Sequence, residues 1–87
     1  MSLPRVKRIL LDVMKPREVP LIELAKALCE LLGVEEVSAV VTEVDARTET
    51  MRLTIKGRDI NYEEVSKLLI SNSCAVRSID EIDVCKE

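Results

Sequence analysis

The stretch Val6–Pro16 constrains the fold more than any other part of the chain. At the period of a β-strand, three of its residues share one purely apolar face: Ile9, Leu11 and Val13. The other face mixes large apolar residues with charged ones: Arg8, Leu10, Asp12 and Met14. A strand facing water on one side would carry mostly polar residues there. We therefore predict a central strand with one face in a core and the other covered as well.

A helix is predicted after this strand. Pro20 suits the first helical position, and Gly33 is the expected stop, because glycine readily takes the left-handed conformation past a last turn. The apolar stripe between them has the spacing of an amphipathic helix: Leu21, Leu24, Ala25, Leu28, Leu31 and Leu32.

A hairpin follows this helix. Val34–Val44 is rich in Val and Thr and is predicted to be a strand, with a bulge near the adjacent Val40 and Val41. The polar residues 45–49 form a turn, and residues 51–56 alternate as a second strand. The link is too short for a crossover, so the two strands must run antiparallel.

The last third of the chain predicts a helix and an edge strand. Asn61 with Glu64 three residues later forms a capping-box signature, and Ile60 with Val65 is spaced as a hydrophobic staple. This helix is expected to end near Asn72, before a strand over residues 75–85. The apolar residues of that strand are Val76, Ile79, Ile82 and Val84.

The element order βαββαβ predicts an α+β, ferredoxin-like fold. Each strand-helix-strand unit crosses over right-handed, and the hairpin interleaves the two units into an antiparallel sheet of order 4-1-3-2. Both helices then cover one face and leave the other open. Residues 4–87 are interpreted as a single domain, and residues 1–3 as a leader that precedes it.

Composition excludes several functions that this fold can carry. The chain has one Tyr and no Phe or Trp, so its core is aliphatic and its open face lacks the aromatic rings that stack on RNA bases. The net charge of −3 disfavours any nucleic-acid backbone as a partner. No apolar run reaches the ~20 residues of a membrane span. A soluble, cytoplasmic protein that binds neither nucleic acid nor membrane is expected.

The cysteines indicate no cofactor. Cys29, Cys74 and Cys85 are far apart, and the chain has no His to complete a zinc site. An iron-sulfur cluster would need clustered cysteines. Reduced thiols in a cytosolic protein are the expected state.

Several segments together resemble a known family. They are Arg-Ile-Leu-Leu-Asp-Val-Met-Lys-Pro (8–16), Gly-Val-Glu-Glu-Val (33–37), Glu-Val-Asp (43–45), Thr-Ile-Lys-Gly-Arg-Asp (54–59) and Ser-Ile-Asp-Glu-Ile (78–82). As a set they are similar to the small archaeal proteins of the domain of unknown function family 211, over nearly the whole chain. The resemblance implies a ferredoxin-like fold, a cytosolic archaeal protein and homo-oligomers, and it implies no activity.

The carboxylates are the candidate metal ligands. Glu43 and Asp45 are two residues apart, about 6.6 Å along an extended chain, and could share Ca²⁺ or Mg²⁺. Asp12 lies at the same end of the sheet but about 9.6 Å away, across two strand spacings. The alternative is that these acids are solvated and pair with Arg47 or Arg52.

The sequence favours a homo-oligomeric binding or regulatory module, with a cation or small ligand at subunit boundaries. Its predicted interface uses Leu10 and Met14 of the open face and Ile79 of the edge strand. One alternative is a small hydrolase or isomerase that uses Asp12 with Lys15 or Arg17. Another is a structural subunit of a larger complex. An enzyme is disfavoured, because the chain has no Ser-His or Cys-His arrangement and no Gly-rich phosphate loop.

Overall fold

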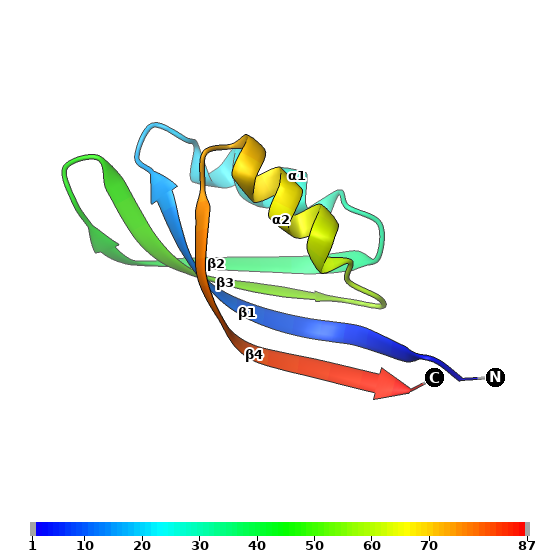
Figure 1. The fold of residues 1–87 in the computed structure, drawn as a ribbon. Coiled ribbons are helices and arrows are strands. Elements are labelled where there is room, and N and C mark those ends of the chain that lie inside the picture. Colours follow the sequence, from blue (N-terminus) through cyan, green and yellow to red (C-terminus); the bar gives the residue numbers. More distant parts are fainter. Residues whose placement is uncertain (1, 87) are drawn as a thin grey trace.

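The computed structural model describes residues 2–86, so Met1 of the predicted leader and Glu87 of the predicted domain lie outside the described residues. The elements in chain order are β1 (Pro4–Pro16), α1 (Leu21–Cys29), β2 (Val34–Val44), β3 (Thr48–Gly57), α2 (Tyr62–Ser71) and β4 (Ala75–Lys86). The strands form one antiparallel sheet of order β2-β3-β1-β4, with both helices on one face (Figure 1). The predicted ferredoxin-like topology is confirmed.

The core lies between the sheet and the helices, and it is aliphatic as predicted. Ile9, Leu11 and Val13 of β1 are at most 1% exposed. The other buried members come from both helices, the two hairpin strands and the segments that flank α2: Leu24, Leu28, Val34, Met51, Leu53, Ile55, Ile60, Val65, Leu69 and Cys74. Because β1 is central, its apolar face contributes the middle of this core.

The hairpin and the second helix follow the sequence closely. The predicted bulge in β2 is found slightly later, where the register with β3 shifts between Val41 and Glu43. The Asn61 side chain accepts a hydrogen bond from the Glu64 amide, which caps α2 as predicted. Ile60 and Val65 are both buried in the core, as a staple requires.

The first helix is shorter than predicted, because it begins at Leu21 and ends at Cys29 instead of continuing to Leu32. The last turn tightens: the Leu31 amide bonds to the Leu28 carbonyl, and the Val34 amide bonds to the Leu31 carbonyl. The chain needs these residues to turn back toward the start of β2. Leu31 still packs against the core, whereas Leu32 is 94% exposed.

The molecule is longer than a compact domain of its size. Its radius of gyration is 13.0 Å and its extents are 50 × 22 × 17 Å, whereas about 12 Å is expected for the radius of gyration of this many residues. The N-terminal part of β1 and the C-terminal part of β4 pair with each other and extend past the start of α2 (Figure 1). We call residues 4–8 and 79–86 the wing.

Candidate functional site

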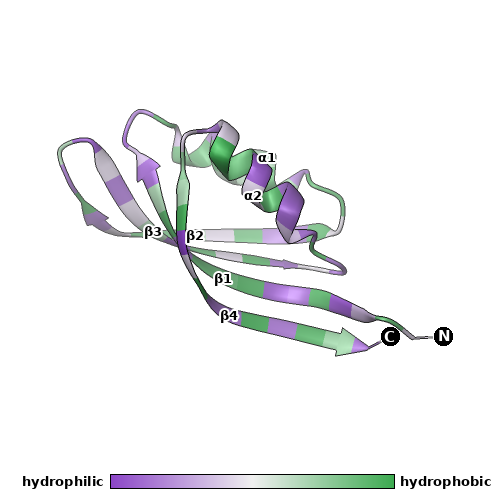
Figure 2. Cartoon of the chain, viewed as in Figure 1, coloured by the Kyte–Doolittle hydropathy of each residue, from purple (hydrophilic) through white to green (hydrophobic). Residues whose placement is uncertain are grey.

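The wing exposes an apolar strip on the face of the sheet that carries the helices. Ile79 pairs with Leu11, Ile82 with Ile9 and Val84 with Val6, and directly paired residues share a face. Ile79, Ile82 and Val84 are 51, 56 and 52% exposed, although Leu11 and Ile9 opposite them are 0 and 1% exposed. Apolar residues continue along β4 past the helices (Figure 2). The strip therefore continues the surface of the core where no helix covers it.

A bulge at Asp80 puts Ile79 on the same face as Ile82 and Val84, and a bulge at Arg77 puts Val76 on that face too. The register between β1 and β4 shifts around Arg77 and again around Asp80, so each of these residues is left without a direct partner. Each extra residue reverses the alternation that follows it. Without the bulges, Val76, Ile79 and Ile82 would alternate between the two faces, because they are three residues apart.

On the other face, ion pairs join the two strands of the wing. Arg8 donates from Nη2 to Glu81 Oε1 at 2.6 Å and from Nε to Asp83 Oδ2 at 2.9 Å. The hydrogen bond to Glu81, and then the one to Asp83, raises the pKa of Arg8. Both acids are more than half exposed, so these ion pairs contribute little to the free energy of folding. Their role is to orient β4 relative to β1.

The predicted interface residues do not lie together. Leu10 and Met14 are on the open face of the sheet, where both are partly exposed and Asp12 lies between them. Ile79 is on the opposite face, because its partner is the buried Leu11. The predicted interface therefore corresponds to two separate surfaces. One is the mostly polar open face with Leu10 and Met14, and the other is the apolar strip on the wing with Ile79.

The candidate metal ligands lie at the other edge of the sheet. Glu43 pairs with Thr50 near the end of β2, and Asp45 follows the strand, where its amide bonds to the Thr48 carbonyl. Asp12 is on β1, two strands away as expected. Residues 2–86 contain no group of three or more His, Cys, Asp or Glu side chains that could hold a metal ion. Cation binding by Glu43 and Asp45 stays a prediction.

The structure does not bring Asp12 and Lys15 together. Asp12 is on the open face, whereas Lys15 is on the helix side and is 1% exposed. Arg17 lies in the loop after β1, where its amide bonds to the Arg47 carbonyl and its guanidinium reaches the Asp45 carbonyl at 3.5 Å. An acid-base pair of Asp12 with Lys15 would need both groups on one side of the sheet.

Lys15 is the buried charge that sequence reasoning missed. Its ammonium donates to the carbonyls of Pro16 at 2.9 Å and Val19 at 2.6 Å, and it lies 3.0 Å from Glu49 Oε1. The signal was the alternation itself, because Lys15 is the next position on the face of Ile9, Leu11 and Val13. Its contacts join the end of β1, the loop before α1 and the start of β3.

The thiols differ in their environment. All three cysteines are free, and Cys29 and Cys85 are exposed whereas Cys74 is buried. Burial raises the pKa of Cys74, and the nearby positive charge of Lys15 opposes part of that rise. Cys85 lies on the wing, opposite Arg5.

Comparison with known proteins identifies the family. The model of the DUF211 family, described as uncharacterized ArCR, matches residues 7–87. The uncharacterized protein MJ0319 of the archaeon Methanocaldococcus jannaschii is 32% identical over 77 residues, which cover 88% of this chain and 79% of the relative. No helix among residues 2–86 is both long enough and apolar enough to cross a bilayer. On these matches, which extend over nearly its whole length, the chain belongs to the DUF211 family.

Proposed function

We propose that this protein is a homo-oligomeric binding or regulatory module whose copies join through the wing. One observation carries the proposal: Ile79, Ile82 and Val84 of an edge strand are each more than half exposed, on the face where their partners on β1 enter the core. An edge strand also presents backbone N–H and C=O groups along its outer side. A second copy can supply both a strand and apolar side chains.

The energies indicate that strand pairing must accompany the apolar contact. Burying the remaining half of each aliphatic side chain contributes about 1 kcal/mol, hence about 6 kcal/mol for three side chains in each of two copies. Association costs at least about 4 kcal/mol and as much as 15 kcal/mol in lost freedom of motion. The apolar strip alone is therefore close to neutral, and hydrogen bonds along β4 are needed for a stable assembly.

Charge favours a second copy over a highly charged partner. The wing carries Arg5, Lys7, Arg8 and Lys86 against Asp80, Glu81 and Asp83, so its net charge is small. A polyanion or polycation would gain little from such a surface. Another wing offers both signs of charge together with the same apolar strip. The exposed free thiols of Cys29 and Cys85 favour the reducing cytoplasm as the compartment.

Light scattering coupled to gel filtration at micromolar concentration tests the assembly. The wild type should elute as an oligomer, and Ile82→Lys should weaken the association at least tenfold, because a charge then enters the apolar strip. Ile22→Lys is the matched control, because Ile22 is 70% exposed on α1, away from the wing. A monomeric wild type, or equal effects of the two substitutions, would contradict the proposal.

The measured mass also separates two arrangements. A dimer indicates that β4 pairs with β4 of the second copy about a twofold axis. A ring indicates that β4 pairs with β2, the other edge strand. Foreign chains that co-purify in fixed stoichiometry would instead favour the structural subunit of a larger complex.

A further inference from the structure

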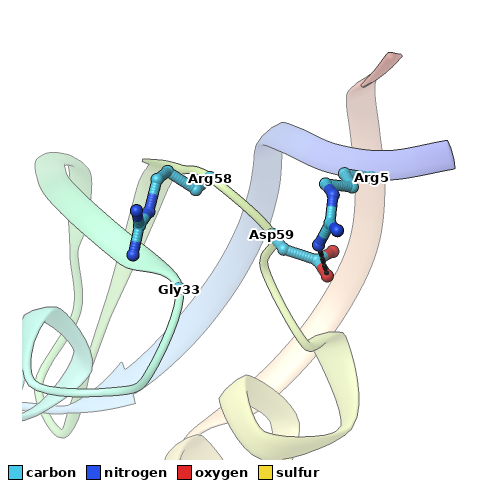
Figure 3. Close-up of a pocket in the computed structure, with 4 residues that line it drawn as sticks. All are labelled: Arg5, Gly33, Arg58 and Asp59. Carbon is cyan, nitrogen blue, oxygen red and sulfur yellow. Dashed lines mark hydrogen bonds and ion pairs between the residues drawn. The ribbon is translucent and has the colours of Figure 1, made fainter. Parts of the chain in front are cut away.

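A pocket lies between the first residues of β1 and the loop that joins β3 to α2. It has a volume of about 440 Å³, is open to solvent and is lined by Arg5, Gly33, Arg58 and Asp59. These residues come from the start of β1, the turn before β2 and the loop after β3 (Figure 3). Three segments that are far apart in the sequence thus meet around one cavity of the size that small molecules occupy.

Gly33 lines this pocket, and Gly57, the other glycine of the chain, packs against its carbonyl. The Gly33 carbonyl accepts the Arg58 amide at 2.8 Å and the Asp59 amide at 3.4 Å. A Cβ atom at Gly57 would lie 1.9 Å from the Gly33 oxygen, and one at Gly33 would lie 2.1 Å from the Asp59 oxygen. Gly33 also has a φ of +85°, in the left-handed region that glycine adopts most readily. The backbone that carries Arg58 and Asp59 is therefore held tightly in place.

The side chains that line the pocket carry one net positive charge, and the carboxylate of Glu35 just outside it pairs weakly with Arg58. Two guanidinium groups and one carboxylate line it. Asp59 Oδ2 lies 3.1 Å from Arg5 Nη1 and so orients the guanidinium of Arg5. Arg58 is 82% exposed, and its Nε is 3.8 Å from Glu35 Oε2, a contact too long for a hydrogen bond. An incoming anion can therefore bind Arg58 without breaking a strong interaction.

We propose that this pocket binds the phosphate group of a small phosphorylated metabolite. Guanidinium groups bind phosphate oxygens in a planar, two-pronged geometry, and Arg58 is the more exposed of the two in this lining, which makes it the principal ligand. Phosphate alone would fill only part of the cavity, so the remaining volume accommodates the organic part of the ligand. The pocket does not include the apolar strip, and binding does not require assembly.

A titration of the ¹⁵N-labelled full chain with inorganic phosphate at constant ionic strength tests the site. The amide signals of Gly33, Arg58 and Asp59 should shift saturably, and acetate at equal concentration should shift them less. Arg58→Gln should raise the Kd for phosphate at least tenfold, the loss expected when a charge-assisted pair is removed. Ile82→Lys should bind phosphate as the wild type does.

Arg47→Gln is the matched control, because Arg47 is an exposed arginine in the turn between β2 and β3, at the opposite end of β3 from Gly57. It should leave the Kd unchanged. The proposal is overturned if those three amides show no saturable shift up to about 10 mM phosphate, a concentration that would fill most of a site with a millimolar Kd. It is also overturned if Arg58→Gln and Arg47→Gln bind phosphate equally well.

Discussion

The two ends of the pairing between β1 and β4 differ in what covers them. At the helix-covered end, Val13 is 0% exposed and its partner Val76 packs against the core. At the other end, Ile9 is 1% exposed whereas its partner Ile82, in the wing, is 56% exposed. Strand pairing and apolar character are the same at both ends. The difference teaches that an edge strand is buried only where a second layer lies over it.

The largest expected effect compares two residues that face each other across this pairing. Leu11→Ala should lower the free energy of unfolding by about 3–4 kcal/mol, because it leaves a cavity in a fully buried site. Ile79→Ala, directly opposite, should lower it by less than about 1 kcal/mol in the monomer, because half of that side chain already contacts water.

Urea unfolding at a concentration where the protein is monomeric measures both values. If Ile79→Ala destabilised the monomer as much as Leu11→Ala does, the wing would be covered within its own subunit and the comparison would fail. Repeating the measurement under oligomeric conditions sharpens the test, because only the cost of Ile79→Ala should then rise.

A smaller effect concerns Cys74, the buried thiol of the helix-covered end. Burial raises its pKa in the folded state above the unfolded value of about 8.5. Above the unfolded value, the unfolded chain has already lost this proton while the folded protein keeps it, so stability falls as the pH rises. The slope should approach, at most, about 1.4 kcal/mol per pH unit.

Urea unfolding between pH 8 and 10 should therefore show a steeper loss of stability in the wild type than in Cys74→Ala. Cys85→Ala is the matched control, because this exposed thiol lies on the wing. Its slope should equal that of the wild type. Equal slopes for wild type and Cys74→Ala would show that the buried thiol does not resist ionisation.

The smallest expected effect is at the opposite edge of the sheet, where Glu43 and Asp45 are the predicted cation ligands. Ca²⁺ at five times its Kd should add about 1 kcal/mol to the free energy of unfolding. The variant Glu43→Gln/Asp45→Asn should lose this response, and Asp80→Asn on β4 should keep it. If calorimetric titration detects no Ca²⁺ binding by the wild type, Glu43 and Asp45 are not a cation site. Of the two edges of the sheet, only the β4 edge would then carry a predicted binding surface.

The sequence predicted those elements whose signals are local. Alternation located β1 and β3, and Asn61 with Glu64 located the start of α2. The end of α1 was wrong, because Leu31 and Leu32 have helical spacing but are needed for the turn into β2. A spacing pattern does not report how many residues a connection requires.

The candidate surface was predicted only in part, for a related reason. Ile79, a predicted interface residue, is exposed on an edge strand, but it was grouped with Leu10 and Met14 of the other face. The bulges at Arg77 and Asp80 reverse the alternation, and a strict period of two cannot anticipate them. The three-residue spacing of Val76, Ile79 and Ile82 was the available signal.

The burial of Lys15 has a consequence for chain length. Its ammonium donates hydrogen bonds to the carbonyls of Pro16 and Val19, so this one buried side chain fixes the length of the connection from β1 to α1. Adding or removing one residue between positions 16 and 19 would move an acceptor out of reach of the Lys15 ammonium. The buried charge would then lack a hydrogen-bond partner. The β2–β3 turn, which is exposed, should tolerate an insertion that this loop would not.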